Sequence, residues 1–107
     1  MTDLSNLVQY VANALKDTKE YREYEEAREE LSKDNELFRR VNEMRQKNFL
    51  LQQENSDNLM ELMDALTNEY EDVINLELTG RFLEAEADVC RMVQEFNNML
   101  AHGLEFE

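Results

Sequence analysis

Proline is absent from this chain of 107 residues, and glycine occurs only twice, at Gly80 and Gly103. These two residue types are the main breakers of helices, so their scarcity favours long helices. Tryptophan is also absent, and no segment shows the period-2 alternation of a β-strand. We therefore predict an all-α fold, with residues 1–107 forming a single helical domain.

Cysteine occurs once, at Cys90, which excludes an internal disulfide and gives no sign of a secreted, disulfide-stabilised fold. No apolar run approaches the roughly 20 residues of a membrane span. Asp3 and the polar residues that follow it interrupt any signal-peptide hydrophobic region. We expect a cytoplasmic protein.

Basic residues are scarce in the second half of the chain. Residues 1–47 carry 9 Lys/Arg against 11 Asp/Glu, whereas residues 48–107 carry 2 against 14, with none between Lys47 and Arg81. A surface of this charge repels phosphate, so direct binding to nucleic acid or to an anionic membrane is not expected. A basic protein partner is compatible with it, and so is a simple role of the charge in solubility.

Apolar residues recur at helical spacing in about five segments. The polar stretch 54–58 is predicted to be a loop, with a continuous helix as the alternative, and Thr79-Gly80 is predicted to separate the last two helices. The expected architecture is a short N-terminal helix followed by two long helical hairpins that close into a bundle. The predicted helices cover residues 3–16, 18–32, 35–54, 57–78 and 81–102.

The segment 35–54 contains a short heptad pattern. Its apolar positions are spaced by 4, 3, 4 and 3 residues, which favours coiled-coil-like packing, and Asn48 occupies one of the core positions. The seam consists of Leu37, Val41, Met44, Asn48 and Leu51.

Catalytic motifs are missing from the sequence. His102 is the single histidine, so the paired Glu-x-x-His motifs of a di-iron bundle cannot form, and no glycine-rich phosphate loop occurs. Acidic residues are numerous, but an Asp/Glu-rich helix face is normally a solvated surface. We do not expect an enzyme.

Residues 81–102 place one carboxylate and the cysteine close to an apolar helix face. At about 100° per residue, Glu86 lies about 40° from Phe82, within the apolar arc, so it should be partly buried with a hydrogen-bond partner. Cys90 lies about 80° away and is predicted to be a small buried hydrophobic residue. The alternative is that Cys90 binds a metal or an iron–sulfur cluster, which requires other chains to supply the remaining ligands.

Methionine occurs six times, and two of these residues lie at the edges of their apolar stripes. Met60 and Met99 are therefore the methionines that we expect at an interface.

An N-terminal amphipathic helix and two later segments resemble, in their order and spacing, the YlbF/YmcA family, and this resemblance covers nearly the whole chain. The run EYREYEEAREELSKDNELFRRVNEMRQK has the family's pattern of two spaced aromatic residues, an alanine and an aspartate that opens a long helix. The closing helix of the family resembles the segment RFLEAEADVCRMVQEFNNML. Family members often have a proline-containing break where this chain has Thr79-Gly80, which suggests that the hinge is kept with other residues. The matching positions are Tyr21, Tyr24, Ala27, Asp34, Phe82, Ala85 and Glu86.

The resemblance implies a small, non-enzymatic, all-helical bacterial protein that forms a homodimer or joins a hetero-complex with related helical proteins. Such proteins act in the control of competence, sporulation and biofilm formation through a complex that influences the endoribonuclease RNase Y. Iron–sulfur clusters are linked to members with several cysteines. With Cys90 alone, this chain is expected to need no cofactor outside a larger complex.

Overall fold

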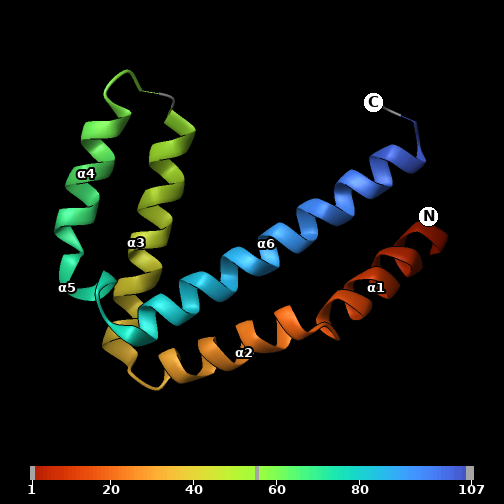
Figure 1. The fold of residues 1–107 in the computed structure, drawn as a ribbon, viewed down its shortest axis with the longest axis horizontal. Helices are drawn as coiled ribbons and strands as arrows, with labels where there is room; N and C mark the ends of the chain where they lie inside the picture. The colour runs from red at the N-terminus through yellow and green to blue at the C-terminus, as the bar shows by residue number, and fades with distance from the viewer. Residues whose placement is uncertain (1, 55, 106–107) are drawn as a thin grey trace. The chain divides into compact units, whose positions relative to one another are not determined.

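The computed structural model describes residues 2–54 and 56–105, and within them it contains six helices and no strand (Figure 1). The predicted all-α fold is thus confirmed. No helix in these two ranges is long and apolar enough to cross a membrane. The helices are α1 (Thr2–Lys16), α2 (Lys19–Ser32), α3 (Asn35–Glu54), α4 (Leu59–Glu69), α5 (Glu71–Ile74) and α6 (Glu77–Gly103).

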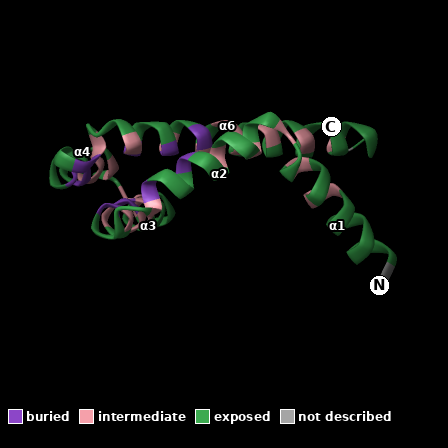
Figure 2. Cartoon of the chain, turned by 90° about the horizontal axis from the view of Figure 1, so that it is seen from below, coloured by how far each residue is buried: buried purple, intermediate pink, exposed green. Residues whose placement is uncertain are grey.

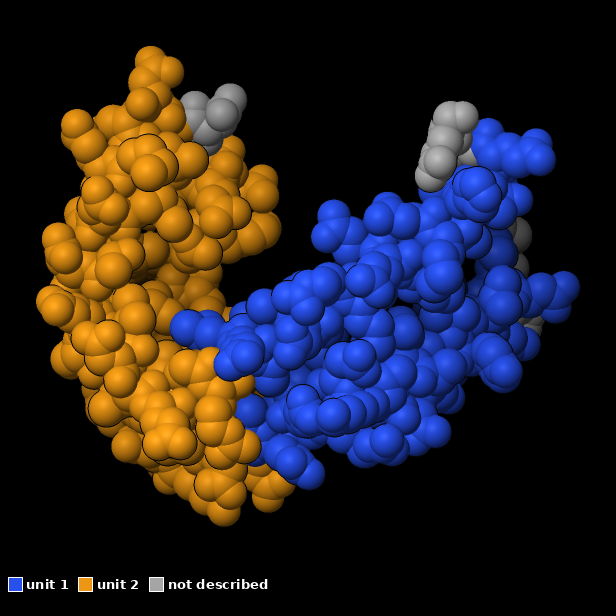
Figure 3. All heavy atoms as spheres, in the orientation of Figure 1, with its two compact units in different colours: residues 1–27, 83–107 blue, residues 28–82 orange. Residues whose placement is uncertain are grey.

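The chain divides into two compact units, which Figure 3 distinguishes by colour. Unit 1 contains residues 1–27 and 83–107, and unit 2 contains residues 28–82. The single domain over residues 1–107 stays a prediction.

Unit 1 is built from α1, the greater part of α2 and the greater part of α6. Thr18 joins the first two helices: its hydroxyl donates to the carbonyl of Leu15 (2.6 Å) and accepts from the amide of Tyr21 (3.3 Å). Thr18 therefore acts as the N-cap of α2. Figures 1 and 2 show α2 and α6 of this unit side by side, whereas Figure 2 shows α1 diverging from α6 towards its N-terminus.

Unit 2 is centred on the antiparallel α3/α4 hairpin, which α5 closes at one end. The predicted start of α3 is confirmed, because the Asp34 carboxylate accepts the amide of Leu37 at 3.1 Å and caps the helix. The heptad positions of α3 supply much of the core. The buried residues of this unit are Leu31, Leu37, Val41, Met44, Leu66, Tyr70, Val73, Thr79 and Phe82.

The predicted loop between α3 and α4 is confirmed. α3 ends at Glu54 and α4 begins at Leu59, with residues 56–58 outside any helix. Asn55, which belongs to the predicted loop, lies outside the described residues.

The predicted helices 57–78 and 81–102 have the wrong boundary. α4 ends at Glu69, Tyr70 adopts a non-helical conformation (φ −110°, ψ 20°), and the single turn α5 precedes the true start of α6 at Glu77. Thr79 and Gly80 lie inside α6, where the Gly80 amide donates to the Leu76 carbonyl at 3.0 Å. One glycine costs a helix only about 1 kcal/mol, which surrounding contacts readily offset. Thr79 and Phe82, both buried, hold this turn in place.

Candidate interaction surfaces

The predicted aromatic pair of α2 lies within unit 1. Tyr21 and Tyr24 are half-buried, and their ring centroids are 5.8 Å apart with the ring planes tilted by 53°. This tilted geometry is a favourable one for aromatic rings. The two tyrosines therefore contribute to packing along α2.

Glu86 behaves as the helical wheel predicted. It is half-buried in α6, and its side chain has an interaction partner. A carboxylate in this position needs such a partner, because burial of an unpaired charge is costly. The predicted partial burial is confirmed.

Phe82 and Asn48 both belong to the interior of unit 2. Phe82 is 1% exposed, and the guanidinium of Arg45 lies 5.2 Å from its ring centroid. Asn48 is half-buried at its heptad position, and its Oδ1 atom is buried with no hydrogen-bond partner among the described residues. Both residues have structural positions in unit 2.

The prediction for Cys90 is wrong, because its side chain is exposed. In unit 1, α6 has only α1 and α2 to pack against, so the covered arc of the helix is narrow. A residue about 80° from the centre of that arc reaches solvent.

Unit 1 carries two stripes of exposed apolar side chains. We call Leu4, Leu7 and Val8 the N-terminal stripe; they share one face of α1, and Leu7 is 57% exposed. We call Val93, Leu100 and Leu104 the C-terminal stripe; the first two lie on the second half of α6, and Leu104 directly follows its last residue. Neither face is covered within the unit.

The two methionines expected at interfaces are both exposed. Met60 of α4 is 76% exposed, and Met99 of α6 lies beside the C-terminal stripe and is also exposed. Both side chains are accessible to a partner, and their role at an interface stays a prediction.

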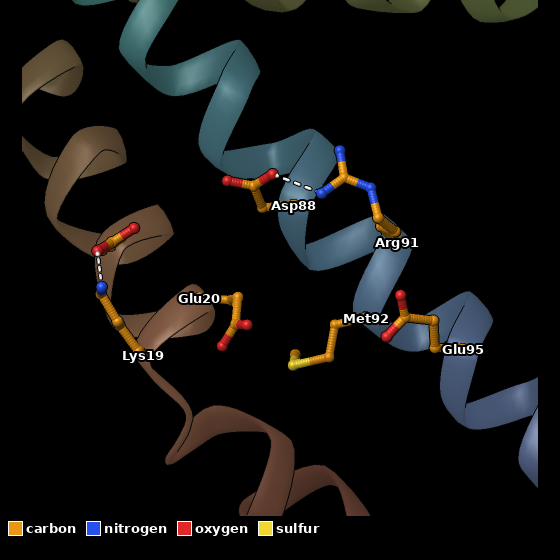
Figure 4. A pocket seen from close by; sticks show the side chains of 7 residues that line it. Lys19, Glu20, Asp88, Arg91, Met92 and Glu95 are labelled. Atoms are coloured by element: carbon orange, nitrogen blue, oxygen red, sulfur yellow. Dashed lines mark hydrogen bonds and ion pairs between the residues drawn. The ribbon is translucent and has the colours of Figure 1, made fainter.

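A polar pocket of about 340 Å³ lies between α2 and α6 in unit 1. Figure 4 shows Glu20 of α2 and Met92 of α6 pointing toward one another across it. Its charges are partly neutralised along each helix, by Lys19 with Glu23 (3.8 Å) and by Arg91 with Asp88 (3.0 Å). Solvent-exposed salt bridges of this kind contribute little to the free energy of folding. The pocket has no nucleophile–base pair.

Unit 2 is organised around a residue that the sequence did not single out. Tyr70 is 2% exposed, and both Arg40 and Lys47 lie over its ring, at 5.3 and 5.1 Å from the centroid. Its hydroxyl donates to the carboxylate of Glu43 at 3.5 Å. The only signal in the sequence is its place in the apolar stripe of residues 59–74, which does not reveal the two cations.

Two ion pairs connect the helices of unit 2. The guanidinium of Arg40 donates to the carboxylate of Asp72, which lowers the pKa of Asp72. Lys47 contacts Glu69 at 2.9 Å, and the side chains of Tyr70 and Glu69 raise the pKa of the Lys47 ammonium. Both pairs are largely solvent-exposed, so they serve mainly to set the register between α3 and the α4–α5 segment.

A groove of about 300 Å³ runs along the α3/α4 hairpin, and we call it the hairpin groove. Leucines and an alanine form most of its lining, and charged residues lie at its ends. The lining residues are Lys47, Leu50, Leu51, Glu54, Leu62, Ala65, Leu66 and Glu69.

The side chains that lie close together in the structure do not form the set of ligands that a metal ion or an iron–sulfur cluster needs. Within residues 2–54 and 56–105, no three His, Cys, Asp or Glu side chains form a group that could hold a metal ion. Cys90 supplies one thiolate, whereas iron–sulfur clusters are held by several cysteines. A cluster bound by a single copy of this chain is therefore not supported.

Comparison with known proteins connects this fold to a regulatory family. The sequence model described as control of competence regulator ComK, YlbF/YmcA matches residues 5–105, and it spans both the tyrosine pair of α2 and the Phe82–Glu86 segment of α6. No curated protein and no solved structure matches the chain. The resemblance that the sequence suggested is confirmed, and the chain belongs to the YlbF/YmcA family.

Proposed function

We propose that this chain is a non-enzymatic regulatory adaptor that acts through helix-mediated protein–protein contacts. The observation that carries the proposal is the N-terminal stripe, in which Leu4, Leu7 and Val8 are all more than half exposed. Contiguous apolar surface of this kind usually marks a site of protein association. Leucine and valine at helical spacing suit the face of another helix.

The charge of α1 favours association with a chain of the same kind. Asp3 and Lys16 are its only charged residues, so two such helices can approach without repulsion although the whole chain has a net charge of −14. The proposed partner is a second copy of this chain, or a related family member in a hetero-complex.

The proposed pathway follows from membership of the family. By its description, the family controls the competence regulator ComK. We propose that this chain acts in a cytoplasmic complex that influences RNase Y, and thereby competence, sporulation or biofilm formation. Contact with proteins is enough for this role, so we propose no cofactor and no direct binding to nucleic acid or membrane. The alternative of a cluster bound through Cys90 has no supporting geometry in the single chain.

Self-association can be tested by sedimentation of the full chain at high micromolar concentration. We expect a dimer for the natural protein. Leu7→Glu should weaken dimerisation by about 100-fold or more, because a buried carboxylate without a partner is strongly unfavourable. Asn6→Glu adds the same charge on the opposite face of α1 and should leave the dimer intact. A natural protein that stays monomeric would rule out the second copy as partner.

The regulatory role needs an experiment in the bacterium. Cells that lack this protein would be complemented with the natural gene, with Leu7→Glu or with Asn6→Glu, and RNase Y-dependent transcript processing would be measured. We expect Asn6→Glu to restore processing and Leu7→Glu to fail at equal protein level. Normal processing in the deletion strain would contradict the RNase Y assignment.

A further inference from the structure

The hairpin groove has a regular construction that none of the proposed contacts of unit 1 uses. α3 contributes Lys47, Leu50, Leu51 and Glu54, and α4 contributes Leu62, Ala65, Leu66 and Glu69. Each set follows the spacing i, i+3, i+4, i+7, so the groove runs beside two turns of each helix, roughly 10 Å. The Lys47–Glu69 ion pair (2.9 Å) marks one end, and Glu54 lies at the other.

The surroundings of the groove are strongly acidic. Residues 48–80 contain eight Asp/Glu and no Lys or Arg. The nearest cations, Lys47 and Arg40, already contact Glu69 and Asp72. The groove therefore combines an apolar lining with Glu54 at one end, in a segment whose net charge is strongly negative, and this charge favours a positively charged ligand.

We propose that the hairpin groove docks a basic amphipathic helix of a partner protein. The length of the groove suits two turns of a helix with apolar anchors spaced three or four residues apart, and Lys or Arg beside those anchors would be attracted by Glu54 and by the negative charge of residues 48–80. This inference goes beyond the self-association proposed above, because it concerns another unit and a partner of different chemistry.

The segments of this chain match the groove poorly. The apolar stripe of α1 is accompanied by a single lysine, Lys16, and that of the second half of α6 by a single arginine, Arg91. A second copy would bring a chain with a net charge of −14 to an acidic surface. Charge complementarity therefore selects a foreign, basic helix.

The test uses a synthetic helical peptide of about 14 residues, or four turns. Its leucines are spaced three and four residues apart, and its other positions are lysine; a sibling peptide has glutamate at those positions. Each is titrated into the isotope-labelled full chain and followed by NMR. We expect one binding site, chemical-shift changes within residues 47–69, and binding of the lysine peptide at least about tenfold tighter than that of its sibling. Added salt should weaken the binding of the lysine peptide.

Two matched variants locate the site. Leu50 lines the groove and is 53% exposed, so Leu50→Ser should leave the fold intact. The substitution should weaken binding of the lysine peptide by about tenfold. Met60 is an apolar residue of the same hairpin that is more exposed, at 76%, but is not part of the groove lining. Met60→Ser should leave the affinity unchanged within about twofold.

Three results would overturn the proposal: equal affinity for the two peptides, shift changes confined to unit 1, or equal weakening by Leu50→Ser and Met60→Ser. If Leu50→Ser in the free protein shifts the resonances of α1 or changes the oligomeric state, the groove holds a segment of this chain and the proposal is likewise wrong. Leu7→Glu should bind the lysine peptide normally, so the two proposals can fail independently.

Discussion

The side chain of Tyr70 contacts three charged residues of α3 in unit 2. Its buried ring receives the cations of Arg40 and Lys47, and its hydroxyl contacts Glu43 of α3. Contacts of a cation with an aromatic face contribute about 0.5–1 kcal/mol at exposed sites. Because the residue also leaves the helical conformation, it ends α4 at the point where the two cations from α3 lie.

The Arg40–Asp72 pair should make the stability of unit 2 depend on pH. Arg40 lowers the pKa of Asp72 in the folded chain. The stabilisation is therefore fully present above the unfolded pKa, about 3.9, and is lost as the pH falls through the lower folded value. Thermal unfolding should show a gap between the natural chain and Asp72→Asn that is constant near neutral pH and closes below about pH 4.

A double-mutant cycle provides the control for this ion pair. Arg40→Gln should reproduce the pH dependence of Asp72→Asn, and combining the two substitutions should add little more. A gap that stays constant down to pH values at which Asp72 is protonated would show that the pair does not stabilise the fold.

At the scale of the helices, regular patterns were predictable from the sequence and interruptions were not. α3 has its predicted bounds because a heptad seam and the Asp34 cap agree. The sequence predicts a break after residue 78, because Gly80 has a weak helix propensity, whereas the packing of Tyr70 and Phe82 places the break earlier in the chain. Propensity is a local quantity, and tertiary contacts override it.

The same limit applies to the candidate surfaces. The N-terminal stripe could be predicted, since it lies on one helix and follows from its periodicity. The hairpin groove could not, because it depends on the register between α3 and α4, which the Lys47–Glu69 and Arg40–Asp72 pairs help to fix. A wheel of α6 alone likewise placed Cys90 inside, since it cannot show how little of the helix is covered.

Gly80→Ala tests the corrected position of the helix boundary. Gly80 has no positive φ, and an added Cβ atom would meet no atom within 4 Å. Alanine should therefore raise the free energy of unfolding by about 0.5–1 kcal/mol. Thermal unfolding should show an increase in Tm of roughly 4 °C.

Gly103→Ala, at the last residue of α6, is the control and should have a smaller effect. If Gly80→Ala instead destabilises the chain, residue 80 lies in a turn, and the break predicted from the sequence is right.

At the scale of the whole molecule, the two units present surfaces of different chemistry. The N-terminal stripe of unit 1 belongs to a helix with one charge of each sign, whereas the groove of unit 2 lies within residues 47–69, where Lys47 is the single basic residue. The first suits a partner with a similar apolar helix, and the second suits a basic one. Two independent surfaces are what an adaptor needs to hold two partners at once.

Hydrogen exchange should distinguish the two units, because the proposed partner is expected to stabilise α1. No side chain of residues 3–16 is buried, so local opening of α1 costs little free energy in the monomer, whereas α3 contributes Leu37, Val41 and Met44 to a core. Mass spectrometry of dilute protein should show fast exchange in α1 and slow exchange in α3. At high concentration, only unit 1 should gain protection, because association stabilises the bound state. Leu7→Glu should abolish that gain; strong protection of α1 in this variant would mean that unit 1 completes its own core.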